Sequence, residues 1–313
     1  MFLRGGTGLV DGVVALDDTT GQKRSVKGLA MIVNSRRALG ALTALLAACA
    51  TARNYSDPDS PRYAAAAPSA APDADTLKVI AFNVQYALHV DRAVALLHLN
   101  ANLSNPDIVL LQEMDDRGAH AFADSLGFGY VYFPASLSPA TKRDFGNAIL
   151  SRFPIEDAHK IILPHLGRFE HGQRAAVGAT ILVGTRRIRV YSVHLATMVE
   201  NGPSARREQL ARVLADADSF QLVVLGGDFN SGTVPEIALP RGFSWPTRHL
   251  GHTERFWGMD HILLKGISLA AGPATGLVHD NHGASDHKPV WARIVLPAET
   301  APAPPNGAGT RQD

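Results

Sequence analysis

The chain has 313 residues, of which 46% are hydrophobic and 19% are charged. This composition is typical of a folded globular protein, with enough chain for one large domain or two small ones. The formal net charge is only +1, so no general positive charge points to nucleic acid as a partner. The single cysteine, Cys49, excludes an intramolecular disulfide.

The segment that leads to Cys49 has the pattern of an export signal. Arg36 and Arg37 precede an apolar run at 38–48, which is too short to span a bilayer comfortably and ends in small residues. The sequence Leu-Ala-Ala-Cys also resembles a bacterial lipobox, in which the cysteine is acylated and becomes the first residue of the mature protein. Two alternatives stay open: export without acylation, and an alanine-rich N-terminal helix with an incidental cysteine.

Shifts in composition divide the chain into five parts. Signal sequences begin with a short basic region, so Met31 is a better start than Met1. The residues after Cys49 are rich in Ala, Pro, Asp and Ser without an apolar period, and the C-terminal residues contain Pro and Gly clusters. We therefore expect a doubtful leader at 1–30, a lipoprotein-type signal peptide at 31–49, a flexible linker at 50–75, a single folded domain at 76–297 and a disordered tail at 298–313.

Strands outnumber helices in the expected domain. Apolar and β-branched runs predict strands at 77–84, 108–111, 130–133, 148–151, 155–163, 175–183, 187–194, 222–225, 261–264 and 290–295. Amphipathic spacing predicts helices at 90–103, 117–126 and 204–217, the second of them stopped by Gly127. Because strands and helices do not alternate strictly, two sheets covered by helices fit this order better than a βαβ repeat.

Several of these apolar runs end in, or start from, a residue that could bind a metal ion or move a proton. The residues concerned are Asn83, Glu113, His194, Asp228, Asn230, Asp260, Asp286 and His287. A polar residue at one strand end is common, but a repeated choice of Asn, Asp, Glu and His indicates side chains that converge on one rim of a sheet core.

Two of these groups contain a carboxylate that could act at a site, and each also has a purely structural alternative. Glu113 ends a buried strand and could bind a hard cation such as Mg²⁺, or could instead cap the following turn. Asp228 and Asn230 follow two glycines and lie two residues apart, so both can face one water or one oxyanion. The alternative for this pair is an Asx-rich turn after a strand.

The remaining groups suggest proton transfer and phosphate binding. Asp286 and His287 could divide the tasks of binding a metal and transferring a proton, with Asp260 orienting the histidine. His194 is a candidate for a second proton-transfer group, although a histidine at a strand end is more often structural. Arg174 could contact a phosphate in a bidentate manner, and a solvated loop is its alternative.

Taken in chain order, the motifs closely resemble those of the endonuclease/exonuclease/phosphatase family, which is also described as DNase I-like. The resemblance covers essentially all of 76–297. Its motifs are Ala-Phe-Asn-Val at 81–84, Leu-Leu-Gln-Glu at 110–113, Gly-Asn-Ala-Ile-Leu-Ser at 146–151, Ser-Val-His at 192–194, Gly-Asp-Phe-Asn at 227–230, Met-Asp-His at 259–261 and Ser-Asp-His at 285–287. Each motif is weak alone, and together in this order they are strong.

The resemblance implies an α/β fold, a four-layer α/β sandwich in which two packed, mostly antiparallel sheets are flanked by helices. It also implies roles for the site residues. Asn83, Glu113 and Asp286 would bind or surround Mg²⁺ or Mn²⁺, and Asn147 and Arg174 would lie near the phosphate. The catalytic set would be His194, Asp228, Asn230, Asp260 and His287. Asp228 and Asn230 would position the attacking water. His287, paired with Asp260, and His194 would transfer protons or stabilise charge.

The expected activity is metal-dependent hydrolysis of a phosphoester, most simply a phosphodiester, by in-line attack of water. Two departures from the abasic-site enzymes, Gln85 in place of an acid and His194 in place of a tyrosine, favour the deoxyribonuclease and sphingomyelinase side of the family. The alternatives are a phosphomonoesterase, a sphingomyelinase-like lipid phosphodiesterase and a non-catalytic surface lipoprotein. The substrate would be nucleic acid, phospholipid or inositol phosphate. We expect an exported monomer anchored in a membrane through lipidated Cys49, at the periplasmic or outer-membrane face, or alternatively a soluble secreted protein.

Overall fold

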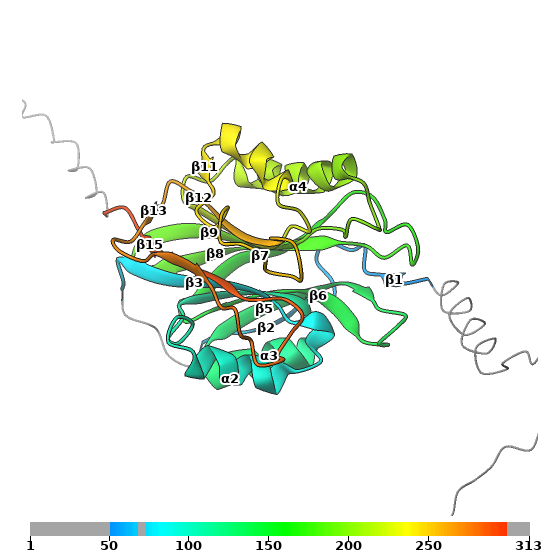
Figure 1. Ribbon diagram of the computed structural model, residues 1–313, viewed down its shortest axis with the longest axis horizontal. Helices are drawn as coiled ribbons and strands as arrows, with labels where there is room; N and C mark the ends of the chain where they lie inside the picture. The colour runs from blue at the N-terminus through cyan, green and yellow to red at the C-terminus, as the bar shows by residue number, and fades with distance from the viewer. Residues whose placement is uncertain (1–50, 68–72, 299–313) are drawn as a thin grey trace, which may run out of the picture. The chain divides into compact units, whose positions relative to one another are not determined.

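The computed structural model describes residues 51–67 and 73–298. These residues form two β-sheets that pack face to face, with helices on the outer face of each sheet (Figure 1). The expected leader at 1–30, the expected signal peptide at 31–49 and the expected tail from residue 299 onward lie outside the described residues. Within the described ranges, no helix is both long enough and apolar enough to cross a membrane.

The first sheet has the strand order β1-β5-β6-β4-β3-β15-β13, with β2 also paired to β5 and β14 to β15. Its strands are β1 (Arg53–Asn54), β2 (Tyr63–Ala65), β3 (Thr76–Asn83), β4 (Ile108–Met114), β5 (Gly129–Leu137), β6 (Asp144–Ser151), β13 (Ser268–Leu269), β14 (Thr275–Leu277) and β15 (Val290–Val295). The pair β3–β4 is parallel, and the other pairs of this sheet are antiparallel.

The second sheet has the order β11-β12-β10-β9-β8-β7. Its strands are β7 (Ile155–Ile162), β8 (Ala175–Val183), β9 (Arg186–His194), β10 (Val223–Asp228), β11 (Phe243–Ser244) and β12 (Asp260–Lys265). The pair β9–β10 is parallel and the other pairs are antiparallel. The expectation of two mostly antiparallel sheets is therefore confirmed.

Helices cover the two outer faces and complete the four layers. The α-helices are α2 (Val90–Leu99), α3 (Asp116–Leu126) and α4 (Pro203–Ala217), and the 3-10 helices are η1 (Gln85–Ala87) and η2 (Val234–Arg241). Figure 1 shows α2 and α3 below the first sheet and α4 above the second. Alternate residues of a strand face opposite sides, so Val79 and Ala81 of β3 pack between the sheets while Ile80 and Phe82 pack under α2 and α3.

The helix boundaries follow from local backbone chemistry. The side chain of Asp115 accepts a hydrogen bond from the Gly118 N–H at 2.7 Å and caps the start of α3. Gly127 ends that helix in the left-handed conformation, with φ 67°, as the sequence predicts. Helix α2 ends at Leu99, earlier than the predicted 103, because Asn100 adopts extended backbone angles (φ −82°, ψ 122°).

The flexible linker expected at 50–75 is wrong for its first part, because residues 51–67 pack on the domain. Strands β1 and β2 both pair with β5. The buried Lys160 ammonium donates to the carbonyls of Tyr55 and Ser60, each at 2.8 Å, and the Tyr55 hydroxyl donates to Asp144 at 2.7 Å. These long-range hydrogen bonds hold a segment that has no apolar pattern of its own.

Candidate active site

Strands from both sheets bring the predicted site residues to one rim. Asn83 ends β3 and Glu113 lies one residue before the end of β4, while His194 ends β9 and Asp228 ends β10. The pairs β3–β4 and β9–β10 are parallel, so the carboxyl ends within each pair meet at the same edge. Asp260 starts β12 directly opposite Asp228, because β12 runs antiparallel to β10.

A cleft of about 350 Å³ opens at this rim. The predicted site residues that line it are Glu113, His194, Asp228, Asn230, Asp286 and His287. Asn83 and Asp260 are buried behind this lining and hydrogen-bond to it. Asn147 and Arg174 do not line the cleft, so the structure brings together most of the predicted set but not all of it.

The backbone around Asp228 explains the need for glycine at 227. Gly227 has φ 139°, and a Cβ on it would lie 2.1 Å from the carbonyl oxygen of Val193 in the neighbouring strand. The N–H of Asn230 donates to Asp228 Oδ1 at 2.8 Å, and its side-chain amide donates to the Leu195 carbonyl at 3.0 Å. This Asx turn, with Asn230 at φ 49°, fixes the Asp228 carboxylate and leaves its Oδ2 toward the other site residues.

Glu113 lies in a β-bulge of β4. The register against β6 shifts between Leu111 and Met114, and Glu113 itself has φ 58°. A non-glycine residue held in such a conformation costs on the order of 1–3 kcal/mol, and strain of this kind is concentrated at functional sites. The Glu113 carboxylate accepts hydrogen bonds from Asn83 at 3.1 Å and from the Tyr86 N–H at 3.0 Å. Burial raises the pKa of Glu113, and the hydrogen bond from Asn83 opposes that rise.

Asn83 bridges the two carboxylates on either side of it. Its amide nitrogen donates to Glu113 Oε1 at 3.1 Å and to Asp228 Oδ2 at 3.0 Å. Its carboxamide oxygen, the atom that would bind a cation, accepts from the Gln85 N–H at 3.0 Å. In this arrangement Asn83 lies beside the expected metal position and orients the carboxylates of Glu113 and Asp228, while its own carboxamide oxygen is not free to bind the metal.

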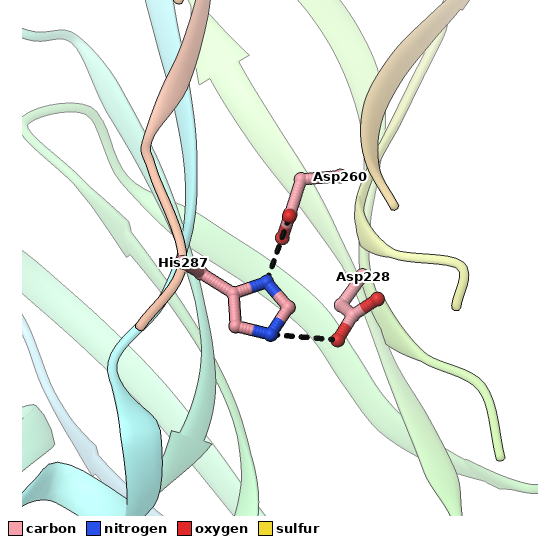
Figure 2. Close-up of side chains that lie close together, drawn as sticks. All are labelled: Asp228, Asp260 and His287. Atoms are coloured by element: carbon pink, nitrogen blue, oxygen red, sulfur yellow. Dashed lines mark hydrogen bonds and ion pairs between the residues drawn. The ribbon is translucent and has the colours of Figure 1, made fainter. Parts of the chain in front are cut away.

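His287 lies between two buried aspartates, as Figure 2 shows. Its Nδ1 is 2.8 Å from Asp260 Oδ2, and its Nε2 is 3.8 Å from Asp228 Oδ2. Asp260 therefore fixes the orientation of the ring and directs Nε2 toward the cleft. Burial alone would lower the pKa of His287, but the charges of Asp260 and then Asp228 hold that pKa well above its ordinary value.

His194 has the opposite electrostatic setting. Burial lowers the pKa of His194 well below its ordinary value, and the positive charges of Arg174 and His287 lower it further. The Arg174 guanidinium lies 3.0 Å from His194 Nε2, and it also donates to Glu200 at 2.6 Å. His194 Nε2 is 3.5 Å from Asp228 Oδ2. The two histidines thus flank one carboxylate in opposite protonation states, which is the separation that acid–base catalysis uses.

The other residue predicted at the phosphate, Asn147, has a different environment. Its amide donates to the carbonyls of Ala175 at 2.8 Å and Ser192 at 3.3 Å. Both carbonyls belong to the second sheet, while Asn147 belongs to β6 of the first. Asn147 therefore connects the sheets behind the site, where its amide hydrogens do not face the cleft.

Several supporting residues were not among the predicted site residues. The Ser285 hydroxyl donates to the Asn83 carbonyl at 2.7 Å and accepts from the His287 N–H at 3.1 Å, so it connects β3 to the loop that carries His287. Asn281 donates to the carbonyls of Ser285 and His287, each at 2.6 Å. Glu200 holds Arg174. Ser285 was visible inside a recognised motif, but Asn281 and Glu200 lie in loops whose sequence carries no signal of these contacts.

The donor set fits a hard divalent cation. Glu113 is half-buried beside the buried Asp228, and the loss of solvent raises the pKa of both carboxylates. A cation bound at Glu113 would offset the cost of placing like charges together away from water, and carboxylate oxygens are the ligands that Mg²⁺ and Mn²⁺ prefer. Ligand atoms of Asp228, Asp260 and His287 also lie within 4.8 Å of one another. The exposed Asp286 side chain lines the same cleft and has Ser285 Oγ 3.4 Å away, so it can supply a further oxygen.

The two packed sheets, their outer helices and a carboxylate–histidine site at one rim define a DNase I-like α/β sandwich. The model of the Endonuclease/Exonuclease/phosphatase family matches residues 80–287, and the chain belongs to this family. Members of the family are hydrolases that act on phosphoester bonds, commonly with a divalent metal ion. No curated protein matches the chain.

Solved structures share the fold at low sequence identity. An endonuclease/exonuclease/phosphatase from Beutenbergia cavernae is 20% identical with a TM-score of 0.57, covering 71% of this chain and 72% of that one. D. rerio TDP2 complexed with single-strand DNA product is 16% identical with a TM-score of 0.55, covering 71% and 99%. Sphingomyelinase C from Streptomyces griseocarneus is 16% identical with a TM-score of 0.50, covering 70% and 99%.

Proposed function

We propose that this protein is a metal-dependent phosphodiesterase that cleaves its substrate by in-line attack of water. The observation that carries the proposal is the convergence of Glu113, Asp228, His194 and His287 on one cleft. Two neighbouring carboxylates, one half-buried and one buried, suit a divalent cation, and two histidines with opposite pKa shifts suit the protons and charge of phosphoryl transfer.

The residues divide the reaction between them. Asp228, whose Oδ1 is fixed by Asn230, positions the water and takes its proton as the new bond to phosphorus forms. His287 is held in its protonated form by Asp260, so charge stabilisation at the phosphoryl oxygens suits it better than the role of base. His194, which its lowered pKa keeps uncharged, lines the cleft and donates a hydrogen bond to the leaving oxygen. That oxygen takes its proton from solvent water as its bond to phosphorus breaks, while Arg174, outside the cleft lining, keeps His194 uncharged. A Mg²⁺ or Mn²⁺ ion held by Glu113 and Asp286 would neutralise charge on the phosphoryl group.

The sharpest test uses a soluble phosphodiester. The purified protein should hydrolyse bis-p-nitrophenyl phosphate with Mg²⁺ or Mn²⁺, and EDTA should abolish that activity. Asp228→Ala and His287→Ala should each lower kcat by ~10²–10⁴-fold, the range for loss of a positioned acid or base. Asp91→Ala and His98→Ala are matched controls, because both side chains are exposed on α2, lie outside the cleft lining and should leave the rate unchanged. Wild-type rates in both site variants would sink the proposal.

We also propose that the protein is exported, acts as a monomer and is acylated at Cys49. The support is the basic-apolar-cysteine pattern before the folded part. Acylation predicts that the native protein partitions with membranes in detergent extraction and that Cys49→Ala moves it to the soluble fraction. An unchanged distribution in that variant would favour export without acylation.

A further inference from the structure

The described chain begins beside the catalytic cleft. The Ala52 N–H donates to the Glu170 carbonyl at 2.8 Å, and Asn54 exchanges side-chain hydrogen bonds with the backbone of 171–173, each at 2.8 Å. Ala52 and Tyr86 line one hollow, and Tyr86 also lines the catalytic cleft. The start of β1, at the right of Figure 1, is therefore attached next to the active site.

This attachment limits how far Cys49 can lie from the site. Cys49 is separated from Ala52 by only two residues. A fully extended chain spans at most about 3.5 Å per residue, so the two Cα atoms lie within ~11 Å of each other. An acyl group on Cys49 would consequently hold this side of the protein at the membrane surface, whereas a long flexible linker would leave its orientation free.

The rim on this side of the cleft carries exposed apolar side chains. Met198 and Val199 line the cleft, and Val199 is 70% exposed. The adjacent segment carries exposed Leu166 and Phe169, and Asn201 connects it to the 197–201 loop by donating to the Leu166 carbonyl at 3.4 Å. Exposure of such apolar side chains to water costs free energy, which is recovered when another apolar surface covers them.

A second apolar group lies on the turn that carries Glu254, another cleft-lining residue. Phe256 is 72% exposed and Trp257 is 49% exposed, and Trp257 forms backbone hydrogen bonds with Glu254. Together with the first group, this turn forms the apolar rim, defined as Leu166, Phe169, Met198, Val199, Phe256 and Trp257. The rim therefore has members on three segments, two of which, the 197–201 loop and the 254–257 turn, contribute residues to the cleft lining.

Arginine accompanies the aromatic residues of the apolar rim. Exposed Arg168 precedes Phe169, and exposed Arg255 precedes Phe256. Aromatic rings favour the interface between lipid headgroups and acyl chains, and arginine attracts the phosphates of anionic headgroups. The aromatic members of the rim could stack on nucleic-acid bases, but Leu166, Met198 and Val199 have no flat face for stacking. Acyl chains can cover all six side chains, so the rim as a whole fits lipid better than single-stranded nucleic acid.

We infer that the apolar rim rests on a membrane surface and that the cleft cleaves the phosphodiester of a membrane phospholipid. This inference rests on the proposed function, because it names the substrate class of the same site. Water adds to phosphorus, one ester bond to phosphorus breaks, and the released alcohol or diacylglycerol oxygen takes the proton. A short tether at Cys49 would keep the cleft facing the membrane, and contact between the rim and the membrane surface would orient the cleft toward the phospholipid headgroups.

The test distinguishes membrane binding by the rim from anchoring through an acylated Cys49 and from hydrolysis in the cleft. The full chain carrying Cys49→Ser removes acylation, and vesicles contain equal parts of phosphatidylcholine and phosphatidylglycerol. A variant that adds Leu166→Ser, Phe169→Ser and Phe256→Ser changes rim residues outside the cleft lining. Leu99→Ser is the control, because Leu99 is 84% exposed at the end of α2, away from the cleft. Vesicle flotation, hydrolysis of vesicle phospholipid and hydrolysis of bis-p-nitrophenyl phosphate are measured in parallel.

The expected result is that vesicle binding and phospholipid hydrolysis fall about ten-fold or more in the rim variant. The Leu99→Ser protein should bind as the parent does, and all forms should hydrolyse the soluble diester equally. Equal vesicle binding by rim variant and parent would overturn the inference, as would a rim variant that loses affinity for single-stranded DNA but not for vesicles. Hydrolysis of the soluble diester without hydrolysis of vesicle lipid would overturn the inference and leave the proposed function intact. Rim-dependent vesicle binding without hydrolysis of either substrate would support the docking and overturn the proposed function.

Discussion

The Nδ1 of His287 lies 2.8 Å from Oδ2 of Asp260, and this carboxylate is almost completely buried. Asp260→Asn would keep the shape but remove the charge that holds His287 protonated and oriented. We expect kcat on a soluble phosphodiester to fall by ~10²–10⁴-fold, with little change in KM. Combining it with His287→Ala should cost no more than His287→Ala alone, because the two residues act as a unit. Additive losses in steady-state kinetics would show that Asp260 has a separate role.

Two asparagines that the sequence assigns to the site should behave differently. Asn83→Ala removes the donor shared by Glu113 and Asp228, leaves two neighbouring carboxylates facing each other, and should lower kcat by about 10²-fold or more. Asn147→Ala instead removes the side-chain donor from two backbone carbonyls between the sheets and should lower the free energy of unfolding by about 1–3 kcal/mol. Urea unfolding and kinetics on each variant check this division. A large activity loss in Asn147→Ala without a loss of stability would return Asn147 to the phosphate site.

Arg174 should act through His194. Its guanidinium contacts the imidazole at 3.0 Å and is held by Glu200 at 2.6 Å. Arg174→Met removes one of the two charges that depress the His194 pKa, so the acid limb of the pH–rate profile should move to higher pH while kcat falls about ten-fold. Arg187→Met is the control, because this exposed arginine forms ion pairs outside the cleft. An unshifted profile in the Arg174 variant would contradict the coupling.

His261 should make stability depend on pH. It is 3% exposed, packs against Trp245 and Phe229, and burial lowers its pKa to about 4. The folded state thus disfavours the charged form, so stability is fully present above the unfolded pKa of about 6.5 and is lost as the pH falls toward 4. At pH 4.5 the loss from this residue is on the order of 2–3 kcal/mol relative to pH 7. Urea unfolding of His261→Phe at both values should show a correspondingly smaller decrease than the wild type.

Strands with strong apolar signals and the residues at their ends were predictable from the sequence. β3, β4, β9 and β10 are mostly buried and each contains several apolar residues, and parallel pairing brings their carboxyl ends to a common rim, so Asn83, Glu113, His194 and Asp228 meet as predicted. What was not predictable is the direction of each polar atom. The Asn83 oxygen faces a backbone N–H, and the Asn147 amide faces two carbonyls, because partners distant in sequence determine both.

The short edge strands were missed for a related physical reason. β1 has two residues and β2 has three, and their residues are mostly exposed or half-buried, so no hydrophobic period marks them. Their position depends on backbone pairing with β5 and on Lys160, which lies in β7 about a hundred residues away. Composition alone predicts a linker here, because alanine and proline are common both in flexible linkers and in short ordered segments of this kind.

Lys160 should therefore determine how well ordered residues 53–65 are on the surface of the domain. Its ammonium donates to the carbonyls of Tyr55, Ser60 and Pro134, and burial lowers the Lys160 pKa. Lys160→Met keeps the apolar stem but leaves these carbonyls without their donor, so residues 53–65 should exchange amide hydrogens faster and be cleaved more readily by protease. Hydrogen-exchange mass spectrometry measures this, with Lys265→Met as the control because the Lys265 ammonium donates to the carbonyls of Ala217 and Asp218, far in sequence from residues 53–65. If the short tether orients the cleft, the acylated Lys160→Met protein should also hydrolyse vesicle phospholipid more slowly while its rate on the soluble diester stays unchanged. Unchanged exchange at 53–65 would instead assign the order of this segment to the strand pairing alone.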